Sequence, residues 1–244
     1  MTVSPRCAPR RCMSVLAIAG VCVVLAGCGG GGDSDLAESS PAQPMPPSAV
    51  ETSAAEPAVE YDISRVAGIT DDFPTGFATA AHPTKTLDQH AIDNSGVAVF
   101  THAQVDPPQC RALTIPPYAE PSAGTEAAGV SAQGDQGNVY VVALHLAQPV
   151  QPSAPPEGCD HVTVSGSPEA DGVAEPVPAP EIADVTTSAA KLSSDTEDEP
   201  NYLFTAALDD RTTVVVMGSV DDQLDPPRLM SDLLVKAVSA IRGQ

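Results

Sequence analysis

Apolar and polar residues alternate along several short stretches in the second half of the chain, which is the period of β-strands. The stretch 138–146 has apolar residues on both faces, so we expect burial on both sides: Val139, Val141 and Ala143 on one, and Tyr140, Val142, Leu144 and Leu146 on the other. Residues 127–133 are its predicted hairpin partner across Gly134-Asp135-Gln136-Gly137, a sequence that tolerates positive φ. A second hairpin is predicted from 202–208 and 212–220, and shorter strands are predicted at 96–100, 161–165 and 185–192.

Near the C-terminus the apolar period changes to that of a helix. Asp225 is a predicted N-cap and Pro226 suits the first helical position. Apolar residues then recur every three or four positions along one helical face. These residues are Leu229, Met230, Leu233, Leu234, Ala237, Val238 and Ile241. Lys236 and Arg242, near the end of the segment, complement the helix dipole.

A shorter helix is predicted to begin at Asp106-Pro107-Pro108 and to carry Cys110 and Leu113. Together with the strands, the two helices predict an α+β fold. We expect a mostly antiparallel sheet with the C-terminal amphipathic helix and the shorter helix packed on it.

The N-terminus has the pattern of an exported bacterial lipoprotein. Three arginines precede an apolar run from Met13 to Ala26, which is too short to cross a hydrocarbon core of about 30 Å. The run ends in Leu25-Ala26-Gly27-Cys28, which resembles a lipobox, the signal after which a Cys receives a diacylglycerol. An ordinary secretory signal that ends near a Cys is the alternative, and Arg10-Arg11 lacks the flanking residues of a twin-arginine signal. We predict a lipoprotein signal peptide at 1–27 and lipidation of Cys28.

Residues 28–60 are predicted to be the lipidated Cys followed by a disordered, acidic, Pro/Ala/Ser-rich tether. From Gly29 to Glu60 the chain contains five Pro, six acidic residues and no Lys, Arg or aromatic residue. Such a segment cannot bury enough apolar surface to offset its ordering entropy. All Phe and Tyr residues lie at or after Tyr61, so a single α+β domain is predicted at 61–244.

The charge balance excludes a nucleic-acid partner. The chain has 11 Lys and Arg against 32 Asp and Glu, and loss of three arginines with the leader leaves 8 − 32 = −24. Nucleic-acid binding needs clustered Lys and Arg that displace counterions from phosphates. The same acidity excludes a basic patch as the membrane anchor, so the predicted attachment is through the acyl chains on Cys28.

The cysteines divide into two groups. Cys7, Cys12 and Cys22 leave with the signal peptide, and Cys28 is the lipidation site. Only Cys110 and Cys159 remain, and two thiols in an exported domain are expected to form a disulfide. The alternatives are two separate buried thiols or two ligands of a metal site, although the pair lacks the CxxC spacing of zinc sites.

The sequence contains no familiar catalytic motif: neither GxSxG, Walker A, GxGxxG nor HExxH is present. No two of the histidines stand four residues apart in a predicted helix: His82, His90, His102, His145 and His161. Cys159-Asp160-His161 would need a free thiol to act as nucleophile and base. The acidic runs 195–199 and 221–225 offer oxygen ligands for Ca²⁺, with solvated charge and helix capping as the alternative. No catalytic residue, metal ligand or cofactor is predicted.

Three segments carry a resemblance to known proteins: Val105-Asp106-Pro107-Pro108-Gln109-Cys110, Pro155-Pro156-Glu157-Gly158-Cys159 and Ser231-Asp232-Leu233-Leu234-Val235-Lys236-Ala237. Together they resemble a mycobacterial (actinobacterial) lipoprotein family of unknown function, over nearly all of 61–244. The Pro-Pro-x-Cys helix start and the disulfide are more remotely similar to the extracellular sensor domains of mycobacterial membrane Ser/Thr kinases, which have two disulfides. This resemblance implies an envelope sensor or ligand-binding role, and it transfers no residue beyond Cys28 and the Cys110–Cys159 pair.

These features favour a non-enzymatic, lipid-anchored protein on the extracytoplasmic side of the cell membrane that binds a ligand or a protein partner. An apolar cavity between sheet and helix is expected to suit a lipid or another envelope amphiphile, and an envelope protein is the other expected partner. The alternatives are an envelope hydrolase without a recognisable motif and a structural surface lipoprotein with no ligand. A histidine within hydrogen-bond reach of a Ser or an acid in a cleft would favour the hydrolase.

Overall fold

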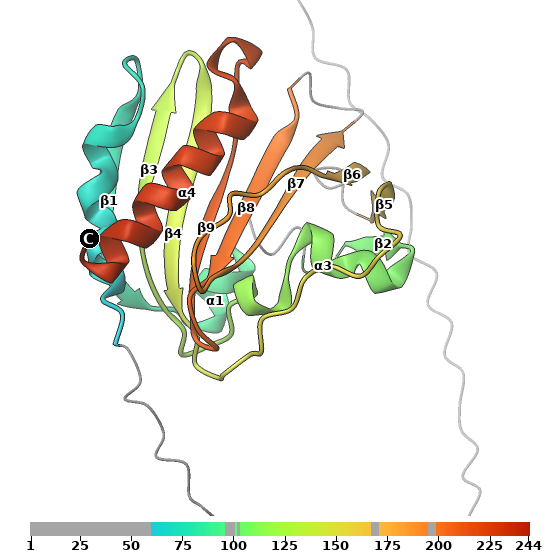
Figure 1. Cartoon of the computed structure of the whole chain (residues 1–244), viewed down its shortest axis with the longest axis horizontal. Helices are drawn as coiled ribbons and strands as arrows, with labels where there is room; N and C mark the ends of the chain where they lie inside the picture. Colours follow the sequence, from blue (N-terminus) through green and yellow to red (C-terminus); the bar gives the residue numbers. More distant parts are fainter. Residues whose placement is uncertain (1–59, 96–100, 102, 167–170, 195–198) are drawn as a thin grey trace, which may run out of the picture. The chain divides into compact units, whose positions relative to one another are not determined.

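The structure is a computed structural model that describes residues 60–95, 101, 103–166, 171–194 and 199–244 (Figure 1). The chain divides into two units, Met1–Ala54 and Ala55–Gln244, and every described residue belongs to the second. Within these residues nine antiparallel strands form one sheet in the order β1-β3-β4-β9-β8-β7-β6-β5-β2. The predicted mixture of a mostly antiparallel sheet with helices is confirmed.

The strands are β1 Ala78–Thr86, β2 Gln104–Asp106, β3 Glu126–Gly134, β4 Gly137–His145, β5 Val162–Ser165, β6 Gly172–Pro176, β7 Thr186–Ser194, β8 Asn201–Ala207 and β9 Thr212–Val220. The α-helices are α1 Gln89–Asp93, α3 Arg111–Thr114 and α4 Pro226–Arg242. Four 3-10 helices are described: η1 Ile63–Asp72, η2 Pro108–Cys110, η3 Pro117–Ala119 and η4 Asp222–Leu224.

The two predicted hairpins form the centre of the sheet. β3 pairs with β4 across the two-residue turn Asp135-Gln136, and β8 pairs with β9. Gly137 closes the first turn at φ +119°, where a Cβ would collide with the carbonyl oxygen of Ser219. This position therefore requires glycine. Pairing of β4 with β9 joins the hairpins into one continuous sheet.

One face of the sheet is covered by α4 and η1 (Figure 1). The core between them contains alternate residues of the central strands, such as Val141, Val216 and Phe204, each fully buried. The helix contributes the buried side chains Pro226, Met230, Leu233, Leu234, Ala237, Val238 and Ile241. These side chains line the region between sheet and helix where the sequence predicts an apolar cavity.

The N-terminus of α4 differs from the prediction in one detail. Asp225 holds the N-cap position, but its side chain makes no capping hydrogen bond. The residue has φ +51° because the chain turns sharply from η4 into α4, and its backbone N–H donates to the carbonyl oxygen of Asp222 at 3.1 Å. The backbone turn and Pro226 therefore set the start of this helix.

The other face of the sheet is covered in part by the chain between β2 and β3. η3 inserts the fully buried Tyr118, whose hydroxyl lies 3.1 Å from the Thr205 Oγ1, while the Thr213 hydroxyl donates to the Tyr118 carbonyl oxygen at 2.7 Å. Burial raises the pKa of Tyr118, and hydrogen bonds with Thr205 and Ser188 oppose the shift. Tyr118 thus connects η3 to β8 and β9.

Several elements differ from the sequence prediction. β1, β2, β6 and η1 were not predicted, and the predicted shorter helix is split into η2 and α3. The predicted strand 96–100 lies outside the described residues. β4 was expected to be buried on both sides, yet Tyr140 is 37% exposed because neither α3 nor η3 extends over that end of the strand. That exposure defines the surface described next.

Candidate functional site

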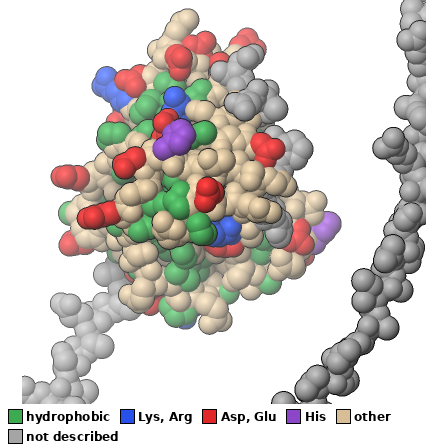
Figure 2. All heavy atoms as spheres, turned by 90° about the vertical axis from the view of Figure 1, so that its right-hand side faces the viewer, with side chains coloured by type: hydrophobic (Ala, Val, Ile, Leu, Met, Phe, Trp, Pro, Cys, Tyr) green, Lys and Arg blue, Asp and Glu red, His purple; other side chains and the backbone are tan. Residues whose placement is uncertain are grey.

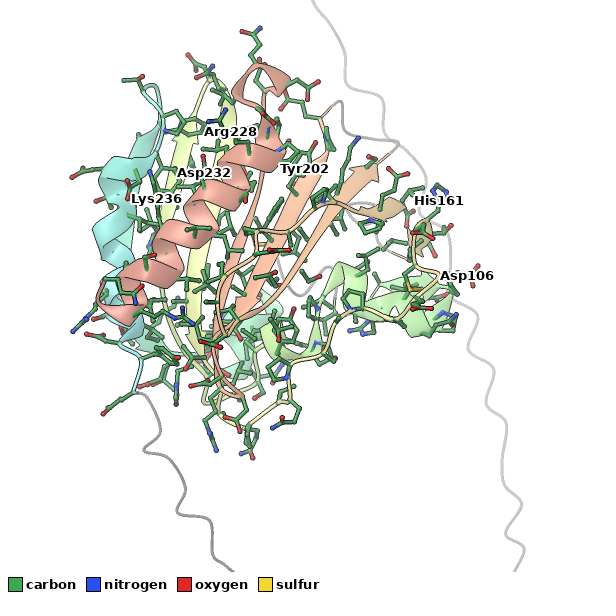
Figure 3. The ribbon with its side chains drawn as sticks, viewed as in Figure 1. Asp106, His161, Tyr202, Arg228, Asp232 and Lys236 are labelled. Atoms are coloured by element: carbon green, nitrogen blue, oxygen red, sulfur yellow. A yellow bond between two sulfur atoms is a disulfide. The ribbon has the colours of Figure 1, made fainter. Side chains whose placement is uncertain are left out.

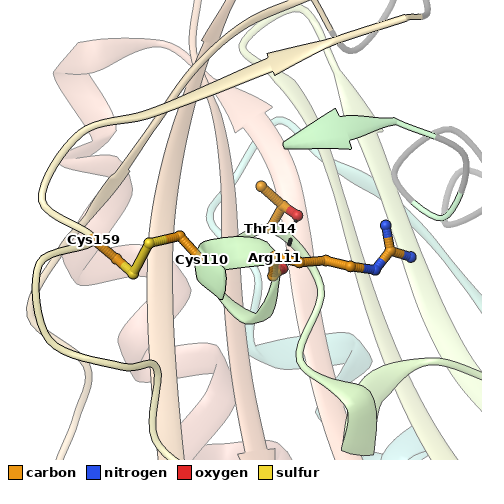
Figure 4. The surroundings of a disulfide bond; sticks show 4 residues. All are labelled: Cys110, Arg111, Thr114 and Cys159. Carbon is orange, nitrogen blue, oxygen red and sulfur yellow. Dashed lines mark hydrogen bonds between the residues drawn. A yellow bond between two sulfur atoms is a disulfide. The ribbon is translucent and has the colours of Figure 1, made fainter. Parts of the chain in front are cut away.

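Cys110 and Cys159 form a disulfide, the pairing predicted from the sequence, with their Cα atoms 5.5 Å apart (Figure 4). Cys110 ends η2, and Cys159 precedes β5. The Arg111 carbonyl oxygen accepts a hydrogen bond from the Thr114 hydroxyl at 2.9 Å, which closes the short turn after Cys110. Because both thiols are in the bond, Cys159-Asp160-His161 has no thiolate to act as a nucleophile.

The described histidines lie on separate elements. The nearest ion-pair contact between a described histidine and an acid joins the exposed side chains of His161, just before β5, and Glu175, in β6, with 3.6 Å between Nδ1 and Oε1 (Figure 3). His90 lies in α1, where its Nδ1 is 3.2 Å from the Asn94 amide nitrogen. His145 is partly exposed at the end of β4, and His102 lies outside the described residues. These histidines form no shared site.

The acidic runs have ordinary structural roles where they are described. Asp221 accepts a hydrogen bond from the Gln223 backbone N–H at 2.8 Å and so caps η4. Burial raises the pKa of Tyr202, and the charges of Asp222 and Asp225 raise it further. In the other run, residues 195–198 lie outside the described residues. Across the described ranges, no group of three His, Cys, Asp or Glu side chains is arranged to hold a metal ion.

On the side covered by α4, three basic side chains pair with acids. Lys236 Nζ lies 2.8 Å from Asp72 Oδ1, which ties α4 to η1, and Arg228 lies 3.9 Å from Asp232 along the helix (Figure 3). Arg65 contacts Asp62, and the pKa of Asp62 is lowered chiefly by a hydrogen bond from the Ser64 side chain. Figure 2 shows acidic side chains spread over the edge of the sheet near β5 and β2.

The opposite side of β1, β3, β4 and β9, pointing away from α4, has a different character. We call it the Tyr140 face and define it by the solvent-accessible residues His82, Lys85, Ser131, Gln133, Tyr140 and Met217. Within the described residues, Tyr140 and Val235 are the two large hydrophobic side chains that are most exposed, at 37% and 39%. Val235 lies alone on α4, whereas Tyr140 is the cross-strand neighbour of Met217, which is partly exposed.

Two hydrogen bonds flank Tyr140. His82 Nε2 lies 2.9 Å from the Ser131 Oγ, which joins the edge strand β1 to β3. The Gln133 amide donates to the Tyr140 hydroxyl at 3.4 Å. The face thus combines an aromatic ring and a thioether with a rim of hydrogen-bonding groups, which is the chemistry of a binding surface.

Comparison with known proteins identifies the fold family. A family model described as a domain of unknown function, DUF5642, matches residues 62–242. The chain belongs to this family. A solved structure of an uncharacterised protein from Mycobacterium smegmatis, the Rv0999 ortholog, is similar to this DUF5642 chain with a TM-score of 0.54 and 20% sequence identity. The similarity covers 75% of this chain and 97% of that one, and it shows a shared fold. No curated protein matches the chain.

Both comparisons agree with the predicted resemblance to a mycobacterial family of unknown function. The similarity to kinase sensor domains stays a prediction. Cys28 precedes the matched residues and lies outside the described part of the DUF5642 chain. No helix among the described residues has the length and apolar character needed to cross a membrane.

Proposed function

We propose that this DUF5642 protein is a lipid-anchored, extracytoplasmic protein of the cell envelope whose domain binds a ligand or partner without catalysing a reaction. The proposed lipid anchor is supported by the sequence Leu25-Ala26-Gly27-Cys28, which follows a basic N-terminal segment and a short apolar run. The observation that carries binding is the exposed Tyr140 beside Met217 on an open sheet face.

The anchor predicts a specific effect of one cysteine. Cys28→Ala should abolish incorporation of a labelled fatty acid, because the thiol that receives the diacylglycerol is gone. Metabolic labelling followed by gel fluorography of the full chain measures this. Cys22→Ala is the matched control, since Cys22 lies inside the apolar run and should not carry lipid. Unchanged labelling of the Cys28→Ala chain would refute the lipobox assignment.

The histidine geometry favours binding over catalysis. His82 and Ser131 are the pair that a hydrolase would use, with 2.9 Å between the ring nitrogen and the hydroxyl. A serine nucleophile also needs a third group that orients the imidazole and donors that stabilise an oxyanion. No described carboxylate hydrogen-bonds to His82, whose side chain is exposed, and Ser131 is partly exposed. The hydrolase is therefore the second candidate.

The binding proposal has its own test. Native mass spectrometry of the lipidated chain extracted from envelopes should detect it with a bound small molecule or a crosslinked protein. Repeated recovery of the bare chain, with no partner after crosslinking, would contradict binding and favour the structural alternative. Turnover of an ester substrate that Ser131→Ala abolishes would instead favour the hydrolase.

A further inference from the structure

The Tyr140 face carries no acidic residue, although the chain has 32 Asp and Glu. Strand register assigns each residue of β1, β3, β4 and β9 to one side of the sheet, and none on the side away from α4 is Asp or Glu. Glu126 begins β3 but lies by register on the α4 side. Beyond the strand ends, Asp88 caps α1 and Asp135 is in the β3–β4 turn. The strand residues of β1, β3, β4 and β9 that point away from α4 thus include no carboxylate, in a strongly acidic molecule.

Lys85 supplies the charge of this face. Its register neighbour on β3 is Ala127, which is uncharged, and Lys85 makes no ion pair with a described residue. Arg65, Arg228 and Lys236, on the α4 side, each contact a carboxylate, as does Arg111 beside η3. The charge of Lys85 is therefore available to an anion outside the domain.

Tyr140 and Met217 supply the apolar part. A tyrosine with its ring on the surface and its hydroxyl hydrogen-bonded suits a boundary between water and lipid, because one end of the side chain is apolar and the other polar. Met217 adds a flexible apolar contact beside it. The face therefore has the properties expected of a surface that binds anionic lipid. It has an unpaired lysine, an interfacial tyrosine and no acids.

The length of the remaining chain argues for the membrane as the occupant. The 32 residues from Gly29 to Glu60 would join Cys28 to the domain. The tether predicted for these residues would have a root-mean-square reach of roughly 30 Å, which would keep the domain close to the leaflet. The first described helix, η1, packs on the α4 side of β1, the edge strand whose other side carries His82 and Lys85.

We propose that the Tyr140 face docks the domain onto the anionic headgroups of the leaflet in which Cys28 is anchored. This inference rests on the proposed lipid anchor. Tethering replaces a bimolecular encounter by an intramolecular one, so a contact too weak to recruit a free protein is sufficient to orient an attached one. The other surfaces carry carboxylates and are repelled by the same headgroups, which makes the docked orientation specific.

Surface iodination of tyrosine by lactoperoxidase tests this orientation on the full lipidated chain. The chain is inserted into vesicles of dimyristoyl phosphatidylglycerol or dimyristoyl phosphatidylcholine, and iodine at Tyr140 is measured by peptide mass spectrometry. The rate at Tyr140 should be roughly tenfold lower in the anionic vesicles, as expected when about nine-tenths of the molecules are docked. Lys85→Glu should remove the difference. Lys191→Glu is the matched control, since Lys191 lies on β7 on the opposite side of the sheet and should preserve it.

The outcomes separate this inference from the proposed anchor. Equal iodination of Tyr140 in both vesicles, with the chain inserted in both, would overturn the docking and leave the anchor intact. Equal protection in both would also overturn it, because an occupant other than an anionic lipid, such as a second copy, would cover the face. A chain that carries no lipid and does not insert would contradict the proposed function itself.

Discussion

Replacing both Cys110 and Cys159 by Ala is expected to lower the free energy of unfolding by about 4 kcal/mol in the chain-entropy model of loop closure. The bond joins residues separated by 49 positions, so its loss restores many conformations to the unfolded chain. Urea unfolding of the wild-type and double-variant proteins, followed by circular dichroism, measures the difference.

Thiol titration supplies the control for this experiment. The oxidised mature wild-type chain, unfolded without reductant, should show no free thiol at either cysteine. Reduction of the wild type should reproduce the stability loss of the double variant. If the double variant is as stable as the oxidised wild type, the bridge has no part in holding η2 beside β5.

Phe204→Ala should cost about 3–5 kcal/mol of unfolding free energy, the range for truncation of a fully buried Phe. Phe204 lies in the middle of β8 with no exposed surface and belongs to the core beneath α4. The cost includes the lost transfer free energy and the cavity left among neighbours that cannot fully collapse. Denaturant unfolding of the purified variant gives the value.

Tyr140→Ala is the matched control, because Tyr140 is an aromatic residue on another central strand but is 37% exposed. Its expected cost is about 1 kcal/mol or less, as for surface substitutions. Equal costs for the two variants would contradict the assignment of Phe204 to the covered side and Tyr140 to the open side.

The central hairpins and α4 were predictable because their apolar periods are strong. β9 begins and ends where its pattern predicts, and six of the seven apolar positions predicted for α4 are buried. β1 was not predictable, since all nine of its residues are exposed and no buried side imposes alternation on Ala, Thr, His, Pro and Lys. β2 and β6 are too short, at three and five residues, to show a period.

The candidate site was only partly accessible from sequence. The predicted β3–β4 hairpin already places Ser131 opposite Tyr140, as the register shows. His82 joins them from β1, 49 residues from Ser131, and no local signal specifies that pairing. The exposure of Tyr140 was missed because apolar residues on both faces of β4 predicted burial, whereas the covering segments reach only part of the second face.

The distribution of charge also changes what the composition implies. A net charge of −21 predicts repulsion from an anionic membrane, and the sequence gives no basic cluster to offset it. The sheet, however, gathers on one side residues of β1, β3, β4 and β9 that include Lys85 and no acid. On the docking proposal, attraction and repulsion would therefore act on different faces of one domain.

The central claim is that the domain is held at the membrane by lipid on Cys28, and the intact mass of the wild-type protein purified from cell envelopes tests it most directly. The account predicts a chain that begins at Cys28 and carries the added mass of a diacylglycerol. A mass that corresponds to an unmodified chain, or to one that begins at a residue other than Cys28, would contradict it.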